Sequence, residues 1–251
     1  MSMMKKMEAH RGKYLYCIIE SMKPENFGRI GIDGNEVYTI NYKDLAAVVS
    51  DASNSSYEIL HQGLVHQKVV ENVMKKYTLI PMSFGQVPKS KDDVKGFLSE
   101  HYLEMKKMFE KLDGKIELGV KVSWKMDKIM NEIVSSSDRI RVLNKQIKAK
   151  TPEKAYPLKI ELGKLVADAL SRKGESIAND IYELLSHTAV GKKKNKPIVE
   201  NMLLNAAFLV EKEKEKEFDE KVNEAEKKYG DKVTFKYVLS PPYNFVSIRG
   251  R

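Results

Sequence analysis

The stretch that most limits the fold is residues 78–87, an apolar run that lies between two segments with helical periodicity. Such a run, flanked by polar residues, predicts a strand with protein on both of its faces. Pro81 lies inside the run and has no amide hydrogen to donate, so the strand is bulged, lies at a sheet edge, or begins there. Gly85 indicates a bend or a close backbone approach. We therefore expect a kinked core strand here rather than a catalytic loop.

The composition indicates a soluble globular chain. Its 251 residues, 42% hydrophobic and 31% charged, are enough for two domains. No apolar run approaches the ~20 residues of a membrane-spanning helix, and residues 1–13 lack the apolar stretch of a secretory signal. The single cysteine, Cys17, lies in an apolar run, which predicts a buried thiol in a reducing compartment. We expect a cytoplasmic protein without a membrane partner.

The formal charge of +9 is unevenly distributed along the chain. Residues 1–115 carry 17 basic and 15 acidic side chains, which leaves a net charge of +7 for residues 116–251. Such a balance attracts acidic partners in general, including nucleic acid, phospholipid headgroups and acidic proteins. The charge balance alone does not identify which of these partners the chain binds.

Residues 1–115 have the pattern of an N-terminal α/β domain. Apolar runs predict strands at residues 14–20, 36–41 and 45–50. Helical spacing predicts helices at 57–77 and 91–112, the second capped by Gly114. The apolar stripe expected on the first helix comprises Ile59, Leu60, Leu64, Val65, Val69, Val70, Val73 and Met74.

Residues 116–251 have the pattern of a second domain. Apolar and small or polar side chains alternate without a fault over residues 116–124, which predicts a strand with one buried face. Apolar residues at nearly heptad spacing on both sides of Thr151-Pro152 predict a long antiparallel helical hairpin over about 125–187. Gly174 is expected to break or bend its second arm.

The remaining segments of this domain complete a known order of elements. We expect a weak strand at 187–191, a solvated lysine-rich loop at 192–196, a buried strand at 202–210, a surface helix at 211–229 and a last strand at 233–239. This is the order of a ferredoxin-like split βαβ. The predicted fold class is α+β: two α/β domains, the second ferredoxin-like with an inserted long antiparallel helical hairpin.

The polar residues assemble no recognisable catalytic, cofactor or metal site. The five histidines have no metal-ligand spacing, and Ser/His/Asp or Cys/His nucleophile motifs are absent. His66 falls on the stripe side of its helix, which predicts a hydrogen-bonded residue near the core. Asn205 and Asn244 lie among apolar residues, so each is expected to make a buried hydrogen bond that joins its strand to the Pro-Pro turn.

Seven further motifs, in order along the chain, accompany residues 79–87 and together resemble the gas vesicle protein F/L family (GvpF/GvpL). They are Tyr14-Leu15-Tyr16, residues 44–50, His66 with Val69-Val70-Glu71, residues 117–122, residues 160–163, residues 205–210 and Pro242-Tyr243-Asn244-Phe245. Ser83, Gln86 and the lysines of 192–196 depart from the family pattern, so the choice between the F and L branches stays open. The motif residues for which the resemblance implies a structural role are His66, Pro81, Phe84, Gly85, Asn205, Tyr243, Asn244 and Phe245.

The resemblance implies a non-enzymatic protein that takes part in building gas vesicles. It implies contact with the small hydrophobic shell protein and with other accessory proteins, as an assembly factor or as a minor structural component of the vesicle. The hairpin seam supplies candidate contacts at Ile129, Ile133, Leu162 and Leu165, although packing of these residues against each other is their more common use. The alternative is an RNA-binding ferredoxin-like module, which the lack of Lys or Arg in residues 202–210 disfavours.

Overall fold

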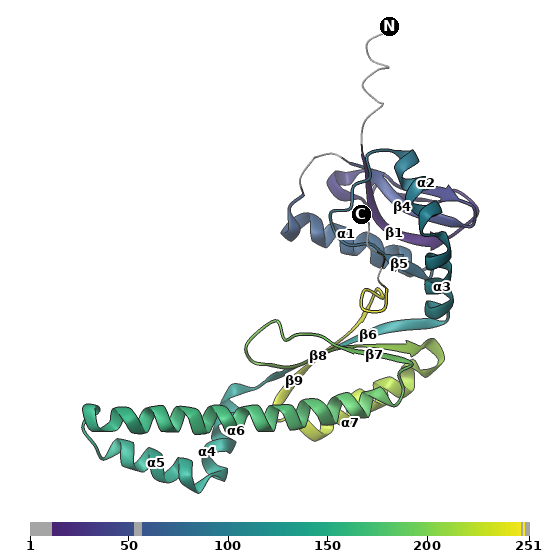
Figure 1. Cartoon of the computed structure of the whole chain (residues 1–251). Coiled ribbons are helices and arrows are strands. Elements are labelled where there is room, and N and C mark those ends of the chain that lie inside the picture. Colours follow the sequence, from purple (N-terminus) through teal and green to yellow (C-terminus); the bar gives the residue numbers. More distant parts are fainter. Residues whose placement is uncertain (1–11, 53–56, 247, 249–251) are drawn as a thin grey trace. The chain divides into compact units, whose positions relative to one another are not determined.

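The structure is a computed structural model, and it describes residues 12–52, 57–246 and 248. The chain divides into two compact units, drawn in Figure 1. The first unit comprises Met1–Glu117 and Ser240–Arg251, and the second comprises Leu118–Leu239. Helices and antiparallel strands occur in both units, which confirms the expected mixture of the two.

The first unit is built on a five-stranded antiparallel sheet in the order β2-β3-β4-β1-β5. Its strands are β1 (Lys13–Glu20), β2 (Asn26–Gly28), β3 (Val37–Tyr42), β4 (Leu45–Asp51) and β5 (Leu79–Pro81). A short 3-10 turn, η2 (Ile32–Gly34), lies between β2 and β3. β1 and β4 are buried along almost their whole length, as their continuous apolar sequences predict.

A β-bulge changes the phase of β1, which lies between β4 and β5 in the sheet. The pairing of β1 with β4 shifts register between Leu15 and Cys17. Strict alternation would place Tyr14, Tyr16 and Ile18 on one face, whereas the core cluster beneath α1 contains both tyrosines together with Cys17 and Ile19. The bulge therefore brings two tyrosines and the only cysteine to the same apolar layer.

Three helices cover this sheet. They are α1 (Ile59–Met74), which contacts β1 and β5, α2 (Lys91–Glu100), which contacts β3 and β4, and α3 (Tyr102–Leu112), which contacts β5. The single helix expected at 91–112 is thus two helices, because the backbone leaves helical geometry at His101 (φ −100°, ψ 13°). Ser90 caps α2 by accepting a hydrogen bond from the Asp93 amide at 3.1 Å.

The apolar run at 78–87 forms a shorter strand than its sequence predicts. Only Leu79–Pro81 is a strand, and it pairs with β1 at the edge of the sheet, one of the positions that a proline permits. Beyond it the chain continues alongside β1, with the amide of Met82 donating to the Tyr16 carbonyl oxygen at 3.0 Å. Gly85 then adopts φ +87°, which a strand does not allow and which favours glycine.

The second unit contains a four-stranded sheet in the order β7-β8-β6-β9. Its elements are β6 (Lys115–Trp124), α4 (Met126–Ser136), α5 (Asp138–Lys148), α6 (Pro152–Ser186), β7 (Gly191–Lys194), β8 (Met202–Glu211), η3 (Lys212–Lys214), α7 (Glu215–Tyr229) and β9 (Val233–Ser240). Both α6 and α7 contact β8. Phe208 of β8 packs between Tyr182 of α6 and Phe218 of α7, with ring centroids 5.5 and 5.4 Å away.

The helical hairpin differs from its prediction in both arms. The first arm is divided into α4 and α5 at Ser137, whose hydroxyl accepts from the Ile140 amide and so begins a new helix. The second arm, α6, runs unbroken for 35 residues along α4 and α5 (Figure 1), so the break expected at Gly174 is wrong. The lysine-rich loop expected at 192–196 is also wrong in part, because Gly191–Lys194 is the edge strand β7.

The chain passes from the first unit to the second between Glu117 and Leu118, whereas the sequence predicted a boundary between residues 115 and 116. The first unit also includes the C-terminal segment from Ser240 onwards, whereas the sequence predicted that this segment belongs to the second domain. The reason is a set of hydrogen bonds between Glu117 and this segment, described below. Among the described residues, no helix is long and apolar enough to cross a membrane.

Candidate functional site

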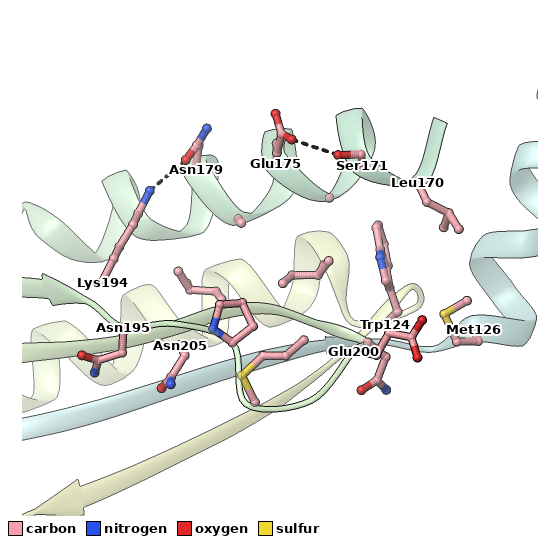
Figure 2. Close-up of a pocket in the computed structure, with 17 residues that line it drawn as sticks. Trp124, Met126, Leu170, Ser171, Glu175, Asn179, Lys194, Asn195, Glu200 and Asn205 are labelled. Carbon is pink, nitrogen blue, oxygen red and sulfur yellow. Dashed lines mark hydrogen bonds between the residues drawn. The ribbon is translucent and has the colours of Figure 1, made fainter. Parts of the chain in front are cut away.

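A pocket of about 730 Å³ lies between α6 and β8 in the second unit (Figure 2). Its lower wall is formed by β8, by the end of β6 and by the segment that joins β7 to β8. Apolar side chains form most of its floor. They include Trp124, Pro197, Met202 and Leu203, and Leu170 and Ala178 line the pocket from α6. We refer to it as the α6–β8 pocket.

Gly174 sets how closely α6 approaches this floor. A Cβ atom at this position would lie 3.0 Å from Leu203 Cδ2 and 3.4 Å from Trp124 Cζ2. A glycine at this position, despite its low helix propensity, therefore lets α6 lie close to the Leu203 and Trp124 side chains. Trp124, the only tryptophan of the chain, is held at the end of β6 by its amide, which donates to the Asn201 carbonyl oxygen at 2.9 Å.

The ends of the α6–β8 pocket are polar and differ in charge. Figure 2 shows Lys194 and Asn205 at one end, and Glu200 beside Trp124 at the other. Lys194 Nζ donates to Asn179 Oδ1 at 2.8 Å and lies 4.3 Å from the ring centroid of Tyr182. The pocket therefore has a fixed ammonium group at one end of an apolar floor.

Asn205 is the one predicted motif residue that the structure places at this pocket. Its Nδ2 donates to the Lys196 carbonyl oxygen at 2.9 Å, and its own carbonyl oxygen accepts from the Asn195 amide at 2.7 Å. These bonds join β8 to the chain just after β7, not to the Pro-Pro turn as the sequence suggested. The Lys-rich segment is thus held in place by Asn205.

His66, in the first unit, is the centre of a buried hydrogen-bond network. Its Nε2 lies 3.1 Å from the Met82 carbonyl oxygen, which can only accept, so this nitrogen carries the proton. Nδ1 therefore accepts from the Tyr14 hydroxyl at 3.1 Å, and that hydroxyl accepts in turn from the Gly85 amide at 3.0 Å. The Tyr243 hydroxyl oxygen lies 3.4 Å from Nε2 as a second acceptor. Burial lowers the pKa of His66 to about 4, so the ring is neutral at pH 7.

The C-terminal motif is joined to the first unit through Glu117. Glu117 Oε2 accepts from the Asn244 amide at 2.9 Å, and Oε1 accepts from Asn244 Nδ2 at 2.6 Å and from the Ser240 hydroxyl at 3.1 Å. Phe245 stacks below the ammonium group of Lys111, which lies 5.8 Å from the ring centroid. Sequence reasoning placed Glu117 on the wetter face of its strand, and it missed this buried carboxylate because its partners lie more than a hundred residues away.

The other motif residues of the first unit lie around β1. Pro81 ends the edge strand, and Gly85 supplies the left-handed turn that brings its amide to Tyr14. The Phe84 ring lies 5.9 Å from the His66 ring, centroid to centroid. These residues thus meet in one polar and aromatic cluster beside α1, which contains no residue from the α6–β8 pocket.

The hairpin residues that we considered as partner contacts differ in exposure. Ile129 and Ile133 are buried in the structure and offer no surface to a partner. Leu162 and Leu165 of α6 are half-buried. A contact made by this seam would have to rely on the two leucines of α6.

The first two turns of α1 expose an apolar surface that we call the α1 patch, formed by Ile59, Leu60 and Leu64. The exposed fractions of these side chains are 76%, 87% and 60%. We expected all three on the buried stripe of the helix, but that stripe is buried only from His66 onwards, at Val69, Val70 and Val73. Three large aliphatic side chains on adjacent turns are an unusual concentration for a surface.

In the part of the chain that the structure describes, no group of three or more His, Cys, Asp or Glu side chains is placed to hold a metal ion. Burial raises the pKa of the Cys17 thiol, so it is a poor nucleophile.

Comparison with known proteins gives one consistent result. The sequence pattern described as "Gas vesicle synthesis protein GvpL/GvpF" matches residues 12–247. The chain is 26% identical to gas vesicle protein F of Microcystis aeruginosa, with 94% of this chain and 98% of that protein covered. It is 28% identical to gas vesicle protein F1 of Halobacterium salinarum, with 94% and 92% covered.

A solved structure extends this likeness to the fold. The crystal structure of the gas vesicle protein GvpF from Anabaena sp. PCC7120 superposes with a TM-score of 0.81 at 26% identity, covering 96% of this chain and all of that one. The corresponding protein of Microcystis aeruginosa gives a TM-score of 0.75, also at 26% identity, over 94% of this chain and 99% of that one. The chain therefore belongs to the gas vesicle GvpL/GvpF family.

Proposed function

We propose that this protein is a non-enzymatic accessory factor that binds the small hydrophobic shell protein of gas vesicles and limits its aggregation before assembly. A shell subunit that faces gas must present apolar surface, and before assembly that surface favours self-association. A partner suited to this problem needs an exposed apolar contact on a well-solvated protein, and it needs no reaction chemistry. The other accessory proteins of the vesicle are proposed as further partners, and the gas vesicle and the cytoplasm as its location.

The observation that carries the proposal is the α1 patch. Leu60 and Leu64 lie one helical turn apart and project from the same side of α1 into solvent. Below them, Val69, Val70 and Val73 of the same helix are buried against the sheet, so the patch rests on a fixed element. Burying its three side chains against a partner would contribute about 1.5–3 kcal/mol for each, before the costs of association.

We also assign the second unit to the ferredoxin-like class with an inserted helical hairpin. The strand order β7-β8-β6-β9 and the sequence of elements along the chain support this assignment. Under it, α4 and α5 with the long arm of α6 form the insertion. Leu162 and Leu165 on that arm remain proposed as secondary contacts for the partner.

The test is co-expression of the tagged chain with the shell protein, followed by affinity purification. Wild-type protein should retain the shell subunit, and the double variant Leu60→Lys, Leu64→Lys should lose it. The matched control is Leu103→Lys on α3, which replaces a leucine that is 74% exposed outside the patch. Because all three positions are exposed, each variant is expected to fold.

Two results would contradict the proposal. If wild-type chain fails to retain the shell subunit, it does not bind that subunit, and only a structural role in the vesicle wall remains. If the Leu103 control loses the subunit as completely as the double variant, the contact is not made by the α1 patch.

A further inference from the structure

We propose that the α6–β8 pocket is a second binding site, which takes a partner segment whose apolar residues are followed by acidic residues. This site lies in the second unit and is separate from the α1 patch, so the proposal goes beyond shell binding. The segment that binds in the pocket belongs to another protein.

The α6–β8 pocket is lined by apolar side chains from both of its walls. Trp124, Met202 and Leu203 line it from the sheet, and Leu170 lines it from α6. Its volume of about 730 Å³ is in the range of pockets that bury a small-molecule ligand. Such a ligand is similar in size to a few amino-acid side chains. Met126 at its rim is 41% exposed, so apolar surface continues out of the pocket. An apolar segment would remove this surface from water.

One end of the α6–β8 pocket is positively charged. Lys192, Lys193, Lys194 and Lys196 fall within five residues of the chain. Of these, Lys192 alone has an ion-pair partner within the described residues, Glu183 at 3.8 Å. Lys194 lines the pocket, and Lys192 lies over the same Tyr182 ring. Two ammonium groups with one carboxylate, that of Glu183, favour an acidic partner at this end.

Lysines on an edge strand also have a simpler use, which is to prevent pairing with another strand. That use does not require the side chains to make fixed contacts. Lys194 instead is held over the Tyr182 ring and bonded to Asn179, at the mouth of the pocket (Figure 2). A cation that is already ordered loses less conformational entropy when a carboxylate binds to it. Its position is therefore that of a recognition group.

The carboxylates around the pocket do not cancel this charge. Glu175 lines the pocket from α6, where its carboxylate accepts a hydrogen bond from the Ser171 hydroxyl at 2.9 Å and in Figure 2 points away from the floor. Glu200 lies at the opposite end, beside Trp124. The pocket thus has a preferred direction for a segment that is apolar in one part and acidic in the other.

The experiment uses the full chain and three fluorescein-labelled peptides. Each peptide has the same leucine-rich part, followed by a run of glutamates, glutamines or lysines. Fluorescence anisotropy measures binding, and emission of Trp124, the only tryptophan, reports whether the pocket is occupied. We expect the glutamate peptide to bind and to shift the emission, and its affinity to exceed that of the glutamine peptide by about tenfold. Added salt should reduce this difference.

Two variants and one control locate the site. Met126→Glu and Lys194→Gln should each weaken the glutamate peptide by about tenfold. Lys216→Gln on α7 removes the same charge away from the pocket and should leave affinity unchanged. All three positions are exposed, so circular dichroism should match wild type.

Four outcomes would overturn the proposal. They are no binding of the glutamate peptide at millimolar concentration, equal binding of all three peptides, an equal loss of affinity in the Lys216→Gln control, and tighter binding of poly-uridylate RNA than of the glutamate peptide through the same lysines. The last would make this end of the pocket a nucleic-acid contact.

Discussion

Asn244 donates both its backbone amide and its side-chain amide to the carboxylate of Glu117, at 2.9 and 2.6 Å. The carboxylate is almost fully buried, with 2% of the residue exposed. A buried charge is tolerated only when its oxygens accept hydrogen bonds, so the C-terminal segment completes the first unit rather than trailing from it.

The first prediction follows from this pair. Asn244→Ala should lower the free energy of unfolding of the first unit by about 1–3 kcal/mol, because it leaves Glu117 with a buried oxygen that lacks one donor. Urea denaturation followed by circular dichroism measures this change. Asn131→Ala, at an exposed position of α4, is the control and should stay within about 0.5 kcal/mol of wild type. Equal stabilities for both variants would show that the bond to Glu117 contributes nothing.

The second prediction compares two glycines that have open space around them. A Cβ at Gly85 or at Gly163 would have no neighbouring atom within 4 Å, so the Cβ atom itself meets no clash. Gly85 has φ +87°, and Gly85→Val should destabilise the first unit by about 1–3 kcal/mol through backbone strain. Gly163 lies inside α6, and Gly163→Ala should stabilise the second unit by up to about 1 kcal/mol. Thermal unfolding of the two variants should therefore shift in opposite directions.

The third prediction concerns pH. Folding lowers the pKa of His66 from 6.5 to about 4, so between these values the unfolded chain binds a proton that the folded chain does not. The stability from this group is complete above about pH 6.5 and is lost as the pH falls towards about 4, by about 3 kcal/mol in total.

Carboxylates titrate in the same range, so the test is a comparison with His66→Gln, which has no ring to protonate. The free energy of unfolding should fall less steeply with acidification in this variant than in wild type. Parallel curves would mean that His66 is protonated in the folded protein as readily as in the unfolded chain.

Local patterns predicted most of the elements. The alternation over residues 116–124 and the continuous apolar run at 45–50 correspond to β6 and β4, because strand period and burial are local properties of the sequence. The lysines of β7 do not have the apolar pattern of a strand, because an edge strand needs no apolar side chains of its own.

The sites depend on relationships that no local pattern contains. Helical spacing grouped Leu60 and Leu64 with the buried valines of α1, but it cannot show where the sheet beneath a helix ends. Glu117 looked like a solvated position because Asn244 is distant in sequence. Gly174 was expected to break or bend its helix. The sequence around it does not show that Leu203 and Trp124, which belong to two strands, lie close to this position.

The proposed function requires that the chain hold the shell subunit in solution through the α1 patch. The most direct measurement is light scattering after the shell protein is diluted from denaturant into an equimolar solution of this chain. Wild type and Leu103→Lys should suppress the rise in turbidity, and the double variant Leu60→Lys, Leu64→Lys should not. Unchanged turbidity with wild type, or equal suppression by the double variant, would contradict the account.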